Sequence, residues 1–139
     1  MQNILASSAT FYSVRLLPGQ ELLSELRRVM QTRQLRAAFI AASVGSLTDV
    51  SLRFAGRAES TVFTGKFEVI SLSGTLDENG EHLHLCISDE AGRMFGGHVL
   101  PGCSIRTTLE LVIGELTSVV FNRVQCDLSG YEELDISKR

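Results

Sequence analysis

The sequence has 139 residues and a mass of 15.2 kDa, and 44% of its residues are hydrophobic, which suits one core and leaves no room for a second domain. Charged residues make up 21%, the formal net charge is −3 and the sequence pI is about 5.6. This balance speaks against duplex DNA as an obvious partner, because no global basic character is present.

The N-terminal third predicts a strand followed by a helix. Residues 10–17 mix aromatic and β-branched side chains as strands do, and Pro18-Gly19 ends the run. From Glu21 the apolar residues recur at helical spacing, with acidic side chains early and arginines late. The helix dipole favours that order of charges, so we expect a helix that reaches about Gln34.

The rest of the chain predicts strands joined by tight turns, and we expect an α+β fold: an antiparallel-rich sheet with helix packed on one face, as a single domain over residues 1–139. Asn79-Gly80 stands between two strand-like runs, which is a strong hairpin signal. The predicted strands cover residues 37–44 (ended by Gly45-Ser46), 49–54, 66–76, 82–88, 105–113 and 118–124, with further turns at residues 90–93, Gly96-Gly97 and Pro101-Gly102.

Charge is unevenly distributed along the chain. Residues 1–57 hold seven Lys/Arg and three Asp/Glu, whereas residues 58–139 hold six and thirteen. Four arginines cluster on or near the predicted helix, and a solvated helix face explains them more simply than an anion-binding or nucleic-acid-binding patch. These arginines are Arg27, Arg28, Arg33 and Arg36.

The cysteines and the N-terminal segment predict a cytoplasmic protein. Cys86, Cys103 and Cys126 are an odd number without C-x-x-C spacing, which is typical of reduced thiols. The first residues lack the basic and apolar parts of an export signal, and the longest apolar run, residues 37–42, is far shorter than the ~20 residues that span a bilayer.

All three histidines fall within seventeen residues, in the order H-x-H and then a third. On a strand, His82 and His84 point to one face while Leu83 lies on the other, buried face. His98 directly follows Gly96-Gly97, where the missing Cβ atoms permit a bend and a close backbone approach.

Three neutral imidazoles suit Zn²⁺ and leave a fourth position for water or a ligand, as in catalytic zinc sites. We therefore predict a divalent metal, zinc by preference, on His82, His84 and His98. Ordinary solvent-facing histidines are the alternative explanation. Cys86 lies on the same face of the strand, but a lone cysteine there is better explained as a small buried residue than as a fourth ligand.

Residues that would assist catalysis are less clearly marked. Glu68 stands in an otherwise apolar strand, but an even hairpin loop puts it on the face away from the histidines, and a surface or intersubunit acid explains it better. Arg93 and Arg106 flank His98 in sequence and are candidates for binding a carboxylate, with ordinary surface arginine as the alternative. The catalytic residues stay unknown.

Several motifs in order resemble the PPC domain, the module conserved in plants and prokaryotes, over nearly the whole chain. They are GSL at residues 45–47, GKFEVISLSG at 65–74, HLHLCISDEAGRMFGGHV at 82–99, and then PGC and LELVI. The resemblance implies a homotrimer whose fold is similar to that of acetolactate decarboxylase, an enzyme that holds zinc through three histidines. The H-x-H of the PPC family falls on His82 and His84, and the histidine of its GGH motif on His98.

The resemblance also bears on partners. In plants the domain follows AT-hook segments, and prokaryotic members carry a provisional DNA-binding label. Here no Arg-Gly-Arg-Pro core is present, so direct DNA binding is doubtful. The segment that contacts transcription factors in plants corresponds to residues 65–70, which leaves a protein partner open.

Three functions follow from these observations. The favoured one is a stand-alone, homotrimeric, metal-binding protein of the PPC type with a regulatory or interaction role. The second is a small zinc-dependent enzyme, a lyase or hydrolase acting on a small anionic substrate. The third is DNA association through the arginines near the helix, multiplied by trimer symmetry.

Overall fold

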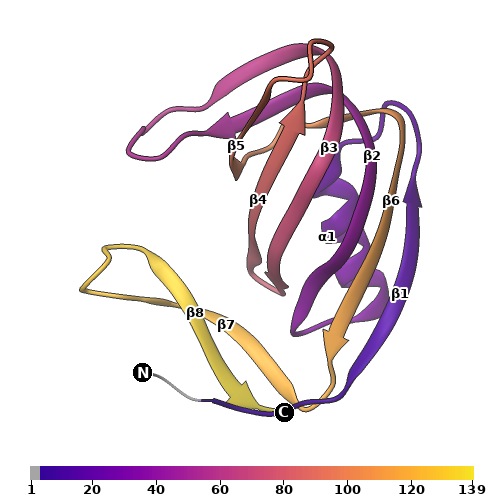
Figure 1. The fold of residues 1–139 in the computed structure, drawn as a ribbon. Helices are drawn as coiled ribbons and strands as arrows, with labels where there is room; N and C mark the ends of the chain where they lie inside the picture. Colours follow the sequence, from indigo (N-terminus) through magenta and orange to yellow (C-terminus); the bar gives the residue numbers. More distant parts are fainter. Residues whose placement is uncertain (1–3) are drawn as a thin grey trace.

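A six-stranded sheet in the order β1-β6-β2-β3-β4-β5 carries the helix α1 on one face, and a two-stranded hairpin, β7-β8, extends from its end (Figure 1). This computed structural model describes residues 4–139. The elements are β1 Ala9–Leu16, α1 Leu22–Arg33, β2 Ala38–Arg53, β3 Thr61–Asp77, β4 Gly80–Ser88, β5 Met94–Val99, β6 Ser104–Leu116, β7 Val119–Gln125 and β8 Glu132–Lys138.

The antiparallel-rich sheet with helix on one face is confirmed. All strand pairings among residues 4–139 are antiparallel, and α1 is the single helix in that range. The proportions are mostly β, since this helix has 12 residues.

Both ends of α1 are capped by the residues at which the sequence predicted them. The Glu21 carboxylate accepts a hydrogen bond from the Ser24 backbone N–H at 2.8 Å, and Gln34 ends the helix in the left-handed region at φ 53°. The apolar stripe packs on the sheet and forms the main core there. Its buried members are Leu22, Leu23, Leu26 and Met30.

Strand β2 corrects one prediction, because Gly45-Ser46 does not end it. The strand runs without a break over 16 residues, with bulges, between β3 and β6. A Cβ on Gly45 would meet the backbone oxygen of Thr108 at 2.1 Å. Glycine therefore serves close packing of β2 on β6 and not a turn.

Strands β3 and β4 form the predicted hairpin with a two-residue loop, since Asp77 pairs with Gly80. Ser73 and Thr75 accordingly face His84 and His82 across the ladder. A bulge at Ile70 then shifts the register, so that Val69 pairs with Ile87 and Glu68 with Ser88. The bulge puts Glu68 on the histidine face, which corrects the prediction of the opposite face.

Strand β5 pairs on both sides, with β4 over most of its length and with β2 at its end. The predicted turn at Gly96-Gly97 is absent, because both glycines lie within this strand. A Cβ on Gly96 would meet the Leu85 backbone oxygen at 2.4 Å, and one on Gly97 would meet that of Arg53 at 2.8 Å. The glycines thus permit the predicted close approach, here to two strands at once.

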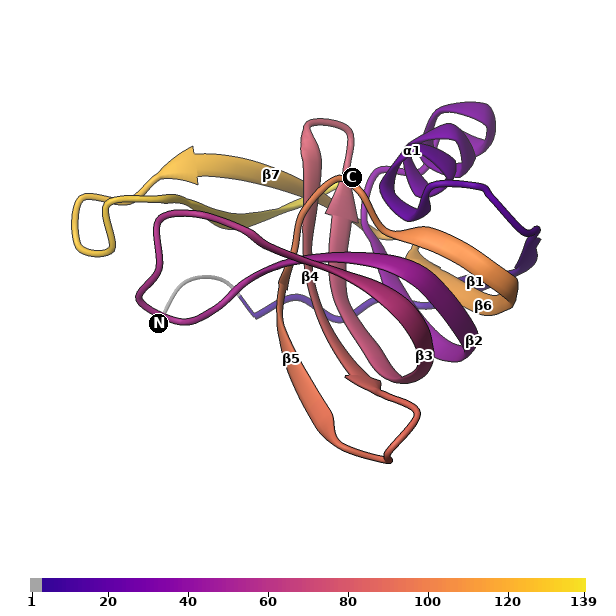
Figure 2. The same ribbon diagram turned by 90° about the horizontal axis from the view of Figure 1, so that it is seen from above.

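The hairpin of β7 and β8 is held by a small second core. Ala37, Val119 and Phe121 are buried in it, with Leu134 and Ile136 packed against them. Figure 2 shows this hairpin and the β2-β3 connection extending to the same side of the molecule, away from α1. Residues of both projections lie close to parts of β4 and β5.

Replacing Gly96 by Ala is expected to destabilise the protein by about 1–3 kcal/mol, because the new methyl group must displace the β4 backbone. Gly80→Ala is the matched control, since no atom lies within 4 Å of the position its Cβ would take. We expect the control to stay within about 0.5 kcal/mol of the wild type in urea denaturation. Equal stability of both variants would contradict the close approach at Gly96.

Candidate metal site

Three imidazoles converge on the face of the sheet opposite α1. The ring centroids of His82 and His84 are 5.1 Å apart, those of His82 and His98 5.2 Å, and those of His84 and His98 5.9 Å. One ring nitrogen from each residue can be chosen so that all three lie within 4.8 Å of one another. A tetrahedral zinc with bonds of about 2.0–2.1 Å sets its ligands about 3.3 Å apart, so the three nitrogens would have to move closer together to hold one ion.

Local structure explains why these side chains share a face. His82 and His84 are exposed residues of β4 that alternate with the buried Leu83 and Leu85. His98 lies directly across the ladder from His84. Gly74, at φ 138°, lets β3 approach the other side of β4, since a Cβ there would meet the His82 backbone oxygen at 1.9 Å.

The electrostatic environment favours the neutral forms of the His82 and His98 imidazoles. Partial burial lowers the pKa of His82, and the neighbouring His84 and Arg123 charges lower it further, while Glu133 acts in the opposite direction. Burial likewise lowers the pKa of His98, followed by the charge of Arg53. Neutral imidazole is the form that binds a metal, so the site is suited to a cation at neutral pH.

The histidines line a cavity of about 790 Å³, which is within the usual range for small-molecule sites. One wall comes from the end of β2 and the following turn, and the opposite wall comes from the turn before β8 and its first residues. Lining side chains with charge or aromatic character are Arg53, Phe54, Arg57, Glu81, Arg123, Tyr131, Glu132 and Glu133.

Four residues considered as assistants from the sequence lie outside this group. Cys86 faces Gly96 across the ladder and is not part of the histidine cluster. Glu68 is exposed and pairs with Ser88, well along the strands from His84. Arg93 forms an ion pair with Asp89 at 2.9 Å, and Arg106 is exposed on β6 and does not line the cavity.

Sequence reasoning missed the charged residues that share the cavity with the histidines. Arg53 and Arg57 come from β2 and the turn after it, and Glu132 and Glu133 from β8, which was not predicted as a strand. The turn pair Ser129-Gly130, after the strand-like residues 118–124, was the available signal for the second hairpin. No local signal brings Arg53 to His98, because that contact depends on the pairing of β2 with β5.

One lining arginine is already neutralised. Arg123 Nε donates to the Asp77 carboxylate at 2.8 Å, and its terminal nitrogen donates to the Thr75 hydroxyl at 2.9 Å. The Asp77 side chain is fully buried, so this pair fixes β7 to the end of β3. The contact holds the β7-β8 wall of the cavity against the sheet.

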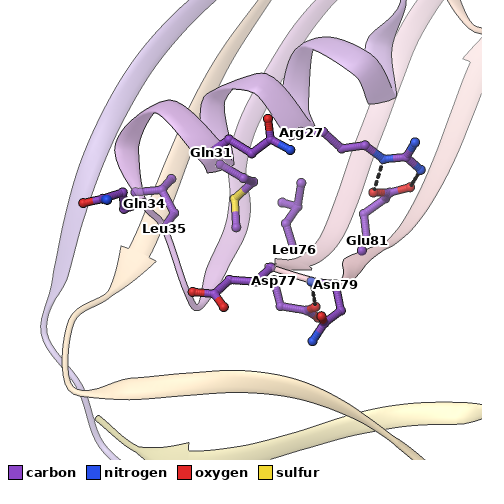
Figure 3. Close-up of a pocket in the computed structure, with 11 residues that line it drawn as sticks. Arg27, Gln31, Gln34, Leu35, Leu76, Asp77, Asn79 and Glu81 are labelled. Carbon is purple, nitrogen blue, oxygen red and sulfur yellow. Dashed lines mark hydrogen bonds and ion pairs between the residues drawn. The ribbon is translucent and has the colours of Figure 1, made fainter.

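A second hollow of about 390 Å³ lies between α1 and the β3-β4 turn (Figure 3). The guanidinium of Arg27 there holds the Glu81 carboxylate through two hydrogen bonds, with Nε at 3.0 Å. Glu81 immediately precedes His82, so the pair fastens the helix to the start of the histidine strand. This ion pair helps to hold β4 in place beside α1. Among the described residues, those that line the hollow do not form a second group of possible metal ligands.

The arginines near the helix form the solvated face that the sequence predicted. Arg28 pairs with Glu25, Arg36 with Glu78 at 3.5 Å, and Arg33 lies 6.0 Å from the centre of the Tyr12 ring. With Arg27 bound to Glu81, three of the four charges have acidic partners.

Comparison with known proteins shows clear relatives. The family model of the Plants and Prokaryotes Conserved (PCC) domain matches residues 5–117. The protein called Bifunctional protein GlmU from Synechococcus sp. (strain JA-3-3Ab) is 41% identical over 137 residues, which are 99% of this chain and 22% of that protein. A second Synechococcus protein of that name is 40% identical, and the chain spans 20% of its length.

Among solved structures, a hypothetical protein from Salmonella is 61% identical, with a TM-score of 0.96 over 97% of this chain and 98% of that one. Three more distant structures share the fold alone. A PPC protein of Pyrococcus horikoshii is 24% identical, with a TM-score of 0.80 over 96% of this chain and 97% of that one. A metal-containing protein of Archaeoglobus fulgidus is 16% identical, with a TM-score of 0.84 over 96% of this chain and 99% of that one. A protein of Bacteroides thetaiotaomicron named for DNA binding is 19% identical, with a TM-score of 0.78 over 93% of this chain and 96% of that one.

The described residues contain no helix with the length and apolar character needed to cross a membrane.

In metal-free protein we expect His82 and His98 to titrate below the ordinary imidazole pKa of 6.5, because burial penalises the charged ring. The folded state then binds fewer protons than the unfolded chain just below pH 6.5, so stability falls as the pH drops toward the lowered values. NMR titration of EDTA-treated protein measures both pKa values.

His84→Gln serves as the comparison, since it removes a neighbouring charge and should return the His82 pKa part of the way toward its ordinary value. Titration of His82 and His98 at or above the ordinary value would contradict the described environment.

Proposed function

The chain belongs to the Plants and Prokaryotes Conserved (PCC) domain family, and we propose that it is a member that binds a divalent metal through His82, His84 and His98. The observation that carries this proposal is the convergence of three imidazoles at the edge of a cavity. Three nitrogen ligands and an open side match the pattern of zinc sites that keep one position for an exchangeable ligand. Zinc bound there would supply a Lewis acid.

A regulatory or interaction role fits the surroundings of this site best. The Synechococcus relatives contain the counterpart of this chain as a fifth or so of a longer protein, which favours a module that serves other parts. No nucleophile and base are paired beside the histidines among residues 4–139. The ion-paired arginines near α1 favour a protein or small ligand over direct contact with DNA, despite the DNA-binding name of the Bacteroides structure.

We further propose that the chain assembles as a homotrimer in the cytoplasm, as its resemblance to the family implies. The support is the face of the sheet that α1 leaves uncovered. Apolar side chains gather there on β1, β2 and β6, and the register sets them on one side: Phe11, Phe39, Ala42, Val44 and Val112. Val44 is 59% exposed, so a partner would bury much of it.

A small zinc-dependent lyase or hydrolase is the second candidate, in line with the proposed likeness to acetolactate decarboxylase. The observation in its favour is Glu133, which lines the same cavity and acts electrostatically on His82. A carboxylate at that place is suited to move a proton to or from a metal-bound ligand. Turnover of a substrate is the readout that separates this candidate from a binding module.

Purified protein supplied with zinc is expected to hold about one ion per chain, and His84→Ala is expected to lose more than about tenfold in zinc affinity. Mass spectrometry of metal content and a competition titration measure the two effects. Cys86→Ala is the matched control, because it changes the same face of β4 but lies outside the cluster. Zinc held equally by His84→Ala and the wild type would disprove the site.

For the assembly, we expect a solution mass three times the chain mass of 15.2 kDa, measured by light scattering. Val44→Asp should lower the mass to that of one chain, because it buries a charge at the interface directly across the ladder from the like charge of Glu110. Thr32→Asp, at an exposed position of α1, should leave the trimer intact. A wild-type protein that stays monomeric at high concentration would rule the trimer out.

A further inference from the structure

Arg53 lies beside the histidine cluster without an acidic partner. The pairing of β2 with β5 sets Arg53 directly across from His98, and the pairing of β5 with β4 sets His98 across from His84. The three residues therefore form one row across three strands, on the same face. None of the ion pairs or side-chain hydrogen bonds within residues 4–139 involves the Arg53 guanidinium, although the residue is half-buried.

This freedom distinguishes Arg53 from the other half-buried arginine of the cavity. Arg123 is occupied by Asp77 and Thr75. Arg57, in the turn after β2, also lines the cavity and adds a second, exposed positive charge on the Arg53 side. The β2 wall thus presents the guanidinium groups of Arg53 and Arg57 to a ligand in the cavity.

The acids of the cavity do not compensate Arg53. Glu81 is bound by Arg27. Glu132 and Glu133 belong to the β8 wall, and Glu133 acts on His82, while the strongest charge acting on His98 is Arg53 itself. The cavity therefore has two arginines on its β2 side, where Arg53 lies beside His98, and two acids on its β8 side.

A divalent cation on the three neutral imidazoles would lie next to this free guanidinium, and the two positive charges repel each other. An anion that occupies the open metal position and accepts hydrogen bonds from Arg53 removes the repulsion. The planar guanidinium matches a carboxylate in a two-point contact, and Phe54 supplies an apolar wall for the carbon part of a ligand. The acids on the β8 wall disfavour a more highly charged phosphate.

We propose that Arg53 is the recognition residue for a small carboxylate, which bridges its guanidinium and the metal held by His82, His84 and His98. This assignment rests on the proposed metal site, and it names the chemical class of the exchangeable ligand. Arg53 thus binds the ligand that occupies the fourth coordination position, and it does not coordinate the metal itself.

Cobalt(II)-loaded protein tests the proposal, because its visible absorption reports changes in metal coordination. Acetate is the probe, and acetamide is the neutral molecule of the same shape. We expect acetate to change the spectrum saturably and acetamide to leave it unaltered. Arg53→Ala should bind acetate at least about tenfold more weakly, since one charge-assisted contact is lost, and Arg53→Lys should lose part of the affinity.

Cobalt content is read first in every sample. Arg53→Ala should hold cobalt at least as tightly as the wild type, because a repelling charge has been removed; a merely structural role would instead weaken the site. Arg106→Ala is the control, since this arginine is exposed on β6 and does not line the cavity. It should behave as the wild type in both measurements.

The outcomes separate this assignment from the metal site itself. If the wild type holds no cobalt, the proposed function fails and this assignment fails with it. If cobalt binds but acetate has no effect, or acts equally on Arg53→Ala, the metal site stands and the role of Arg53 is wrong. A response to inorganic phosphate in place of acetate would overturn the carboxylate class.

Discussion

The two-sided pairing of β5 is the constraint on which the rest of the site depends. This strand has six residues, yet it pairs with β4 along one edge and with β2 at its end. Only glycine at positions 96 and 97 lets both neighbours approach so closely, since a Cβ would meet backbone oxygen on either side. His98 therefore lies across from His84 of β4 on one side and from Arg53 of β2 on the other.

The charges around the site follow a consistent pattern. Where an arginine serves the frame, it is matched with an acid: Arg27 with Glu81 on the helix side, and Arg123 with the buried Asp77 at the hairpin. Arg53 has no acidic partner among the described residues, and it lines the cavity beside the three imidazoles. Arginines in ion pairs hold parts of the fold together. An arginine without an acidic partner at a ligand cavity is instead expected to bind the ligand.

Local patterns predicted much of this protein, and the errors are non-local. The helix from Glu21 to Gln34 and the hairpin at Asn79-Gly80 were predictable because caps and turns are set by a few adjacent residues. The side of the sheet on which Glu68 lies was not, since one bulged residue reverses the alternation. The proximity of Arg53 and His98, forty-five residues apart, arises from strand pairing that no local signal records.

Anomalous diffraction at the zinc edge, from crystals of protein supplied with zinc, tests the central claim most directly. The account predicts one peak per chain within about 2.0–2.1 Å of a ring nitrogen from each of His82, His84 and His98, with its open side toward Arg53. No peak at the three histidines, or a zinc bound at other residues only, would contradict the metal site and the function built on it.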